Sequence, residues 1–148
     1  MRISAKARYG LAAVVSMAEH PDRDVYVTVI SLSEKLNISK IYLEQVFALL
    51  KRGGVVVSTK GAQGGYQLAR RAEEITAYDV LSAVELALVE QTNETVRESD
   101  ECIENAMREC VFGALDGAVK DALTGITLRD VADKAEQGRN NGDYMYYL

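Results

Sequence analysis

Hydrophobic positions between residues 37 and 68 change from a helical period to an extended one. Four of them recur at helical spacing and form one face: Leu43, Val46, Phe47 and Leu50. The glycine pair at 53–54 ends this helix, because glycine enters left-handed conformations without a steric penalty. A short apolar run at 55–57 predicts a strand, and a glycine-rich loop connects it to a partner strand at 66–68. The pattern predicts a helix followed by a β-hairpin.

The residues before this helix predict two more helices and a turn. A helix over about 4–19 is predicted by Ile3, Ala7, Leu11, Val14, Val15 and Ala18. A β-rich run at 25–30 predicts a short strand, and the capping-box spacing of Ser31 and Glu34 predicts the start of a second helix. Ser39 is expected to cap the third helix. Two neighbouring helices and a hairpin are typical of a winged helix-turn-helix, in which a helix enters one DNA groove and the wing touches the next.

The second half of the chain predicts helices separated by one polar stretch. Thr76 and Asp79 signal the start of a short amphipathic helix that extends to about Leu88. Residues 89–100 are polar and charged and predict a loop. A last helix is expected to begin near Thr127.

Between that loop and the last helix, small apolar residues recur every three or four positions. They are Ile103, Met107, Cys110, Val111, Ala114, Leu115, Ala118 and Ala122. This stripe predicts a helix of about five turns. A helix of that length has to bury its stripe, and a second copy of the chain related by a two-fold axis would cover it. Packing on the first helix is the alternative, and both arrangements can hold together. The last helix is expected to end at Gly138.

The charge of the chain is divided unequally along its length. Residues 1–71 hold 11 Lys or Arg and 5 Asp or Glu, whereas residues 72–148 hold 6 and 17, so the net charge of −5 combines a basic half and an acidic half. A basic half attracts phosphates, and an acidic half stays away from a duplex. The alternative is two solvated faces of unequal sign. No apolar run is long enough to span a membrane, and the N-terminus lacks the apolar stretch of a signal peptide, so we expect no membrane partner and a cytoplasmic location.

Polar side chains on the third predicted helix are suited to reading base edges: Ser39, Lys40, Tyr42, Glu44 and Gln45. Lys60 lies at the tip of the predicted wing. Lys6 and Arg8 lie near the start of the first helix, where the helix dipole and positive side chains both favour a phosphate. Ordinary surface charge is the alternative for these two residues.

Five strings of the sequence resemble the Rrf-two family of bacterial transcription regulators, and they occur in the expected order. They are MRIS (1–4) with RYGL (8–11), YLEQ (42–45), KGAQGGY (60–66), ITAYDV (75–80) and ITLRDV (126–131). The resemblance implies a mainly α-helical protein with a small β wing, formed by a winged helix-turn-helix and a long dimerisation helix. Its implied segments are a DNA-binding domain at 1–85, a sensor loop at 86–102, dimerisation helices at 103–138 and a C-terminal tail at 139–148.

The resemblance also implies which side chains contact DNA. Ser39, Ile41, Tyr42 and Glu44 match positions where the family's recognition helix meets the major groove. Lys60 matches the position where the wing reaches a minor groove, whose negative potential favours a cation. Lys6 and Arg8 match backbone-contacting positions of the first helix.

The two cysteines depart from the pattern of the family's iron–sulfur members (the IscR and NsrR types), which have three before the long helix. Cys102 and Cys110 are the only cysteines of this sequence, whereas a cluster usually needs four ligands. A disulfide between them is disfavoured, because eight residues of helix span about 12 Å. We therefore expect no cofactor, with an iron–sulfur cluster as the alternative. Cys110 is expected to be a core residue, and Cys102 a partly exposed thiol open to oxidation.

The end of the chain resembles the family's cysteine-metabolism branch, the CymR type, whose members end in a similar aromatic tail. The tail residues here are Tyr144, Met145, Tyr146, Tyr147 and Leu148. In that branch the regulator works with cysteine synthase, an enzyme whose active site captures C-terminal peptides ending in Ile, and Leu148 departs from that residue. A tail that docks on the protein itself is the alternative.

Together these features predict a homodimeric, sequence-specific DNA-binding regulator, expected to repress sulfur, cysteine or redox-linked genes. The alternatives are an iron–sulfur sensing regulator and an interaction protein that binds an enzyme such as cysteine synthase through its tail. An enzyme is not expected, because the sequence shows no nucleophile–base pair, phosphate loop or paired-carboxylate site.

Overall fold

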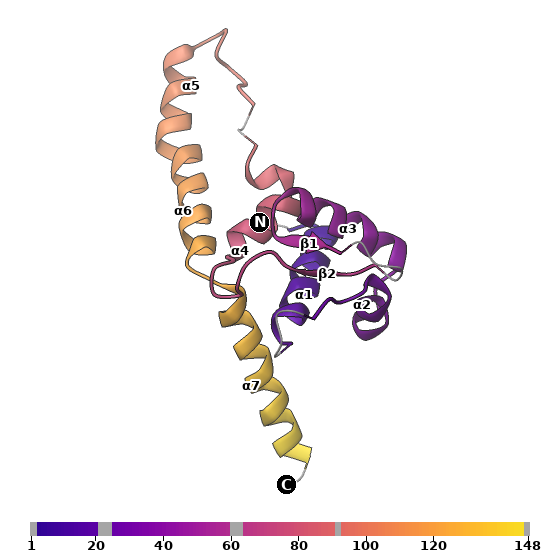
Figure 1. Ribbon diagram of the computed structural model, residues 1–148. Helices are drawn as coiled ribbons and strands as arrows, with labels where there is room; N and C mark the ends of the chain where they lie inside the picture. Colours follow the sequence, from indigo (N-terminus) through magenta and orange to yellow (C-terminus); the bar gives the residue numbers. More distant parts are fainter. Residues whose placement is uncertain (1–2, 21–24, 60–63, 91–92, 147–148) are drawn as a thin grey trace.

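The computed structural model describes residues 3–20, 25–59, 64–90 and 93–146, and for 143–146 it describes the backbone only. The elements are α1 (Ala5–Ala18), α2 (Val29–Leu36), α3 (Lys40–Arg52), β1 (Val56–Ser58), β2 (Tyr66–Leu68), α4 (Ala77–Val84), the 3₁₀ turn η1 (Leu86–Leu88), α5 (Glu101–Met107), the π-helical segment η2 (Arg108–Phe112), α6 (Gly113–Thr124) and α7 (Leu128–Tyr146). Figure 1 shows that α1 to α4 and the hairpin form a compact part, which we call the winged-helix unit. The column of α5, η2 and α6, which we call the helical arm, stands beside it, and α7 continues downward from the lower end of the arm (Figure 1).

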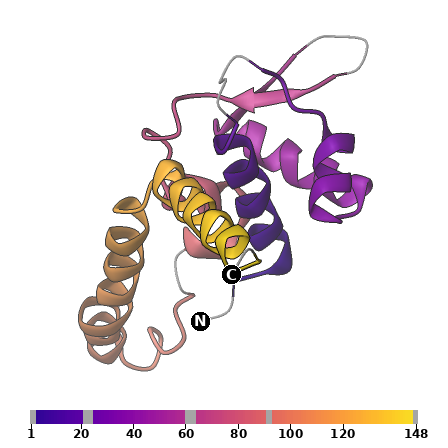
Figure 2. The same cartoon turned by 90° about the horizontal axis from the view of Figure 1, so that it is seen from below.

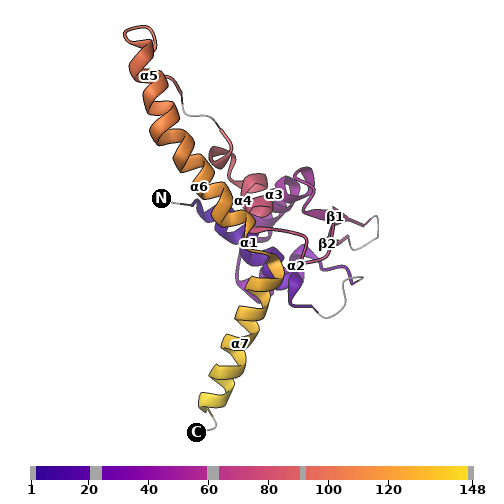
Figure 3. The ribbon, with the colours of Figure 1, turned by 90° about the vertical axis from the view of Figure 1, so that its left-hand side faces the viewer.

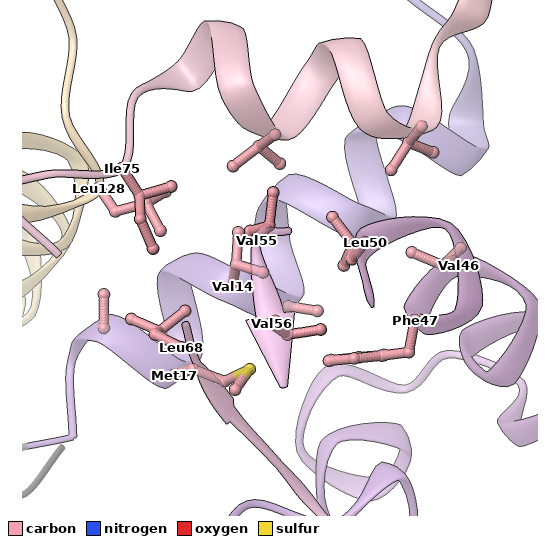
Figure 4. Packing of buried hydrophobic residues seen from close by; sticks show 14 of the residues in the cluster. Val14, Met17, Val46, Phe47, Leu50, Val55, Val56, Leu68, Ile75 and Leu128 are labelled. Carbon is pink, nitrogen blue, oxygen red and sulfur yellow. The ribbon is translucent and has the colours of Figure 1, made fainter. Parts of the chain in front are cut away.

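The core of the winged-helix unit is made by side chains from α1, α3, the hairpin and α4 (Figure 4). Its largest fully buried side chains include Val14, Leu43, Val46, Phe47, Leu50, Val55, Val56, Ile75 and Val80. Leu128, the first residue of α7, is also fully buried and lies beside Ile75. The Leu128 N–H donates to the Ile75 carbonyl at 2.9 Å, so the start of α7 is fixed to the unit. Farther along, α7 packs against α1, as the view from below shows (Figure 2).

The start of α2 corrects two of our predictions. The side chain of Thr28 accepts from the Ser31 N–H at 3.1 Å, and α2 begins at Val29, so the capping box expected at Ser31 and Glu34 is wrong. The strand expected at 25–30 is reduced to a single bridge between Val27 and Tyr66. The competing cap explains both corrections, because helical backbone from Val29 onward leaves little of the run for a strand.

The other predicted caps agree with the structure. Ser4 accepts from the Ala7 N–H at 3.1 Å, and α1 follows it. Thr76 and Asp79 form a complete capping box at the start of α4. Thr127 exchanges the same two hydrogen bonds with Asp130, each close to 3 Å, at the start of α7. Local hydrogen bonding therefore determined where these three helices begin.

The helical arm lies where a five-turn helix was expected, but it is not regular. The π-helical η2 interrupts it between α5 and α6. The expected helix end at Gly138 is wrong, because α7 continues to Tyr146. A glycine inside a helix costs only about 1 kcal/mol, and Arg139, the next residue, pairs with Glu19 of α1. Among the described helices, none combines the length and apolar character that crossing a bilayer requires.

Candidate nucleic-acid interface

The turn between α2 and α3 sets the angle at which α3 leaves the core. Asn37 adopts a left-handed conformation (φ 54°, ψ 49°), which ends α2 abruptly. The Ser33 hydroxyl donates to the Ile38 carbonyl at 2.6 Å and closes the turn. The Ser39 hydroxyl accepts from the Tyr42 N–H at 3.4 Å, as a weak cap of α3. Ser39 thus has a structural role beside its predicted role in DNA recognition.

The opposite face of α3 from the core is polar and accessible. Ile41 is 70% exposed, although it is apolar. Lys40 Nζ lies 3.8 Å from Glu44 Oε1, with both side chains 54% exposed. An ion pair this exposed contributes little to stability. Both side chains are therefore available to a ligand that approaches the start of α3.

The wing is held against α3 by Tyr66, the first residue of β2. Its ring lies 4.6 Å from that of Phe47 on α3, and its backbone exchanges two hydrogen bonds of 2.8 Å with Val27. In the register of the hairpin, Ser58 pairs with Tyr66. Gly64, two residues before Tyr66, has a φ of 63°, a conformation that favours glycine. Packing of Tyr66 on Phe47 therefore sets the position of the hairpin relative to α3. Figure 3 shows the labelled strands and α3 on the same side of the molecule.

A hollow of about 800 Å³ opens between α3 and the hairpin. Its lining comes from the start of α2, the first turns of α3 and the ends of both strands: Thr28, Val29, Ile30, Lys40, Glu44, Ser58, Thr59, Gly64, Gly65 and Tyr66. Lys40 and Glu44 from the predicted site thus face the same space as the base of the wing. Lys60, the predicted minor-groove residue, lies outside the described residues.

A second, shallower hollow lies at the other side of the α3 N-terminus. It is lined by Tyr9, Asn37, Ile38, Ser39, Ile41, Tyr42 and Gln45. The ring of Tyr42 meets the ring of Tyr9 on α1 edge-on, with centroids 5.4 Å apart and an interplanar angle of 86°. Sequence reasoning did not select Tyr9, although an aromatic residue directly after Arg8 on a basic helix was an available signal. The structure thus brings Ser39, Ile41 and Tyr42 together with α1.

The basic residues of α1 lie on the same helix as Tyr9. Arg8 is exposed and Lys6 is half-buried. The first turn of α1 is also tied to the end of α4, because the Ser4 N–H donates to Glu85 Oε2 at 2.9 Å. The hydrogen bonds from Ser4 hold the pKa of Glu85 below its usual value. This contact positions the start of α1 relative to the rest of the unit.

Both cysteines lie on the helical arm rather than in the core. Cys102 is exposed in the first turn of α5, and Cys110 is exposed within η2. The prediction that Cys110 is a core residue is therefore wrong for the single chain. The physical reason is that η2 lies away from the buried cluster, which the arm reaches only near its end, through Leu123.

Comparisons with known proteins agree with this geometry. The family model described as "Rrf2: Iron-dependent Transcriptional regulator" matches residues 3–134. The chain belongs to the Rrf2 family. Among curated relatives, the transcriptional regulator CymR of Bacillus subtilis is 35% identical over an alignment of 151 positions that covers all of both chains. IscR of Pectobacterium atrosepticum is 34% identical over 136 residues, which cover 92% of this chain and 82% of the relative. The solved structure of B. subtilis CymR, the "Global Cysteine Regulator", has a TM-score of 0.70 at 30% identity, covering 90% of this chain and 98% of that one.

Membership confirms the predicted family and fold, a mainly helical winged helix-turn-helix with a two-stranded wing. This member of the Rrf2 family is a DNA-binding transcription regulator, and the regulators it matches are not enzymes. The iron in the family description raises the question of ligands. Within the described residues, no three His, Cys, Asp or Glu side chains are grouped as metal ligands would be. The donor set around Cys102 and Cys110 therefore does not fit a metal centre within one chain.

Proposed function

We propose that this Rrf2 family member is a homodimeric repressor of sulfur, cysteine or redox-linked genes that acts in the cytoplasm. The main support for the proposed mode of DNA binding is the position of α3. Its exposed first turns share one hollow with the base of the wing. A helix and wing fixed in this way suit a major groove and the neighbouring minor groove.

The proposed DNA contacts come from three parts of the winged-helix unit. The recognition helix supplies Ser39, Lys40, Ile41, Tyr42 and Glu44, the first helix supplies Lys6 and Arg8, and the wing supplies Lys60. Ile41 suits an apolar contact such as that with a thymine methyl group. Lys6, Arg8 and Lys60 suit phosphates or a narrow minor groove.

The proposed dimer is supported by the exposed stripe of the helical arm. Ile103, Val111 and Leu115 are each more than half exposed, and no residue of α6 is buried. Half-exposed apolar side chains in a row mark a protein interaction surface. A second copy would cover this stripe and give the two-fold symmetry that repressors share with their operators.

The test begins with duplexes selected by the purified protein from a randomised pool. Fluorescence anisotropy at several salt concentrations then measures affinity for the selected duplex and for an unrelated one. We expect selective binding whose affinity falls steeply with salt, and a slope that Lys60→Ala reduces by about one. Glu44→Ala is expected to alter sequence preference more than affinity. Equal affinity for all duplexes would contradict the proposal.

Control of cysteine genes through an enzyme partner is a second candidate function, supported by the full-length match to CymR. The predicted partner-binding tail includes Tyr144, Met145 and Tyr146 at the end of α7, and Tyr147 and Leu148 outside the described residues. Figure 1 shows that α7 carries this end away from the winged-helix unit. Deletion of residues 144–148 is expected to abolish association with cysteine synthase. Unchanged association would exclude the tail as the binding element.

The alternative of an iron–sulfur sensor has a separate test. Absorption spectra and iron and sulfide assays on protein purified without oxygen distinguish a regulator that holds a cluster from one that holds none. A colourless protein without iron is expected, whereas a brown protein that contains both would favour the sensor. In the expected case, regulation involves thiol oxidation at Cys102 or Cys110, or the enzyme partner.

A further inference from the structure

A buried carboxylate connects the loop before the helical arm to the arm itself. Glu104, on α5, is 6% exposed and is the one buried charged residue among those the structure describes. Its Oε1 accepts from the Thr95 N–H at 3.2 Å and its Oε2 from the Val96 N–H at 3.1 Å. The two oxygens of one side chain thus bind the backbone of two residues that lie nine and eight positions earlier in the chain. A carboxylate buried in this way needs such donors, because burial without them is costly.

Arg97 contacts three further residues of the same region. Its Nη1 lies 3.0 Å from Glu101 Oε1, its Nη2 donates to Asn105 Oδ1 at 3.1 Å, and its Nε lies 2.6 Å from Glu94 Oε2. Arg108 also donates to Asn105 Oδ1, at 3.0 Å. The partners of Arg97 come from both the loop and the first two turns of the arm.

The loop is closed locally at the point where the arm begins. The Asp100 N–H donates to the Val96 carbonyl at 2.7 Å. Asp100 then caps α5, because its Oδ1 accepts from the N–H groups of Cys102 and Ile103 at 3.1 Å. Hydrogen bonds therefore link residues 95–108 into one segment, which we call the polar clasp.

We propose that Glu104 is a positioning residue that orders the polar clasp without a metal. The loop is held by backbone N–H groups on a carboxylate, the kind of contact that needs no added ligand. The donor set of this segment does not fit a metal centre, and hydrogen bonds to the Glu104 carboxylate hold the segment instead. Assembly of a cluster on one chain is then not the event that orders the segment. This inference does not depend on DNA binding by the winged-helix unit.

Amide hydrogen exchange of the full chain, followed by NMR, tests the polar clasp directly. In EDTA we expect the Thr95 and Val96 amides to be protected, and Glu104→Ala to speed their exchange about tenfold or more. Glu98→Ala, which removes an exposed carboxylate of the same segment, is expected to leave both rates unchanged. Anaerobic addition of ferrous iron and sulfide is expected to change neither rate in the wild-type chain.

Glu104→Gln provides a variant that keeps one carbonyl acceptor. One of the two amides is expected to keep its protection, while circular dichroism confirms that the helices are retained. If Glu104→Ala lowers the helix content, the inference is judged on Glu104→Gln and on the wild-type chain. The inference is overturned if the two wild-type amides exchange freely in EDTA, if only iron protects them, or if Glu104→Gln protects both as the wild type does.

Discussion

The winged-helix unit and the helical arm differ in where their hydrophobic side chains lie. In the unit, Leu43, Phe47 and Leu50 are completely buried. In the arm, Val111 and Leu115 are 55% and 51% exposed. The first part has its own core, whereas the second has a stripe that only another surface can bury. The difference teaches that the winged-helix unit completes its hydrophobic core within one chain, whereas the arm provides only half of the surface proposed to pair two chains.

The largest expected effect comes from removing a core side chain of the winged-helix unit. Phe47→Ala leaves a cavity beneath the wing and should lower the free energy of unfolding by about 3–5 kcal/mol. Ile41→Ala on the exposed face of the same helix should change it by less than about 0.5 kcal/mol. Urea denaturation measures both. Similar losses for the two variants would show that the unit lacks the core described above.

The next effect concerns the arm. Leu115→Glu should weaken the proposed dimer on the order of 100-fold, since it removes apolar burial in both copies and introduces two charges. Leu115→Met should retain the dimer, because it keeps the volume and apolar character of the side chain. Light scattering over a dilution series measures the association, and circular dichroism checks the fold. A monomer content that is equal in the two variants would argue against this interface.

Sequence reasoning succeeded where contacts are local and failed where they depend on the rest of the fold. The caps at Ser39 and Thr76 and the two strands of the wing each follow from a few neighbouring residues. The start of α2 was wrong because Thr28 and Ser31 offer competing caps three residues apart. The continuation of α7 through Gly138 was missed because its packing on α1 is not visible in a local pattern.

The candidate site was predictable to a similar extent. Polarity on α3 predicted Lys40, Tyr42 and Glu44 as DNA contacts. In the structure Lys40 and Glu44 are exposed, whereas Tyr42 is half-buried and packs against the core. The ring contact of Tyr9 joins α1 to α3 across 33 residues, and no spacing rule predicts it. Cys110 has helical spacing with the apolar stripe, but spacing does not reveal whether the same chain or a second copy covers it.

A smaller effect should come from Tyr9, which sharpens the description of the DNA-reading face. Tyr9→Leu removes the ring that meets Tyr42 edge-on and should weaken binding to the selected duplex on the order of tenfold. Tyr9→Phe keeps the ring and should lose less affinity. Anisotropy with selected and unrelated duplexes gives both values. Unchanged affinity in Tyr9→Leu would show that the contact does not position Tyr42 for DNA.

The smallest effect concerns pH and the link between α1 and α4. Because the pKa of Glu85 is lowered in the folded chain by its hydrogen bonds with Ser4, its contribution is present above the unfolded pKa and lost as the pH falls through the folded value. Glu85→Gln should therefore be less stable than the wild type by about 0.5 kcal/mol near neutral pH. The difference should shrink below about pH 4.5. Thermal melts at both pH values measure it, and a difference that grows in acid would contradict this sign.

The association of the chain in solution tests the central claim most directly, because the two regions differ chiefly in their need for a partner. Sedimentation equilibrium of the wild-type chain, alone and with the selected duplex, measures how many copies associate. The account predicts two 16.2 kDa chains in both cases, and dissociation of the free dimer by Leu115→Glu. A single chain that binds the selected duplex with full affinity would contradict it.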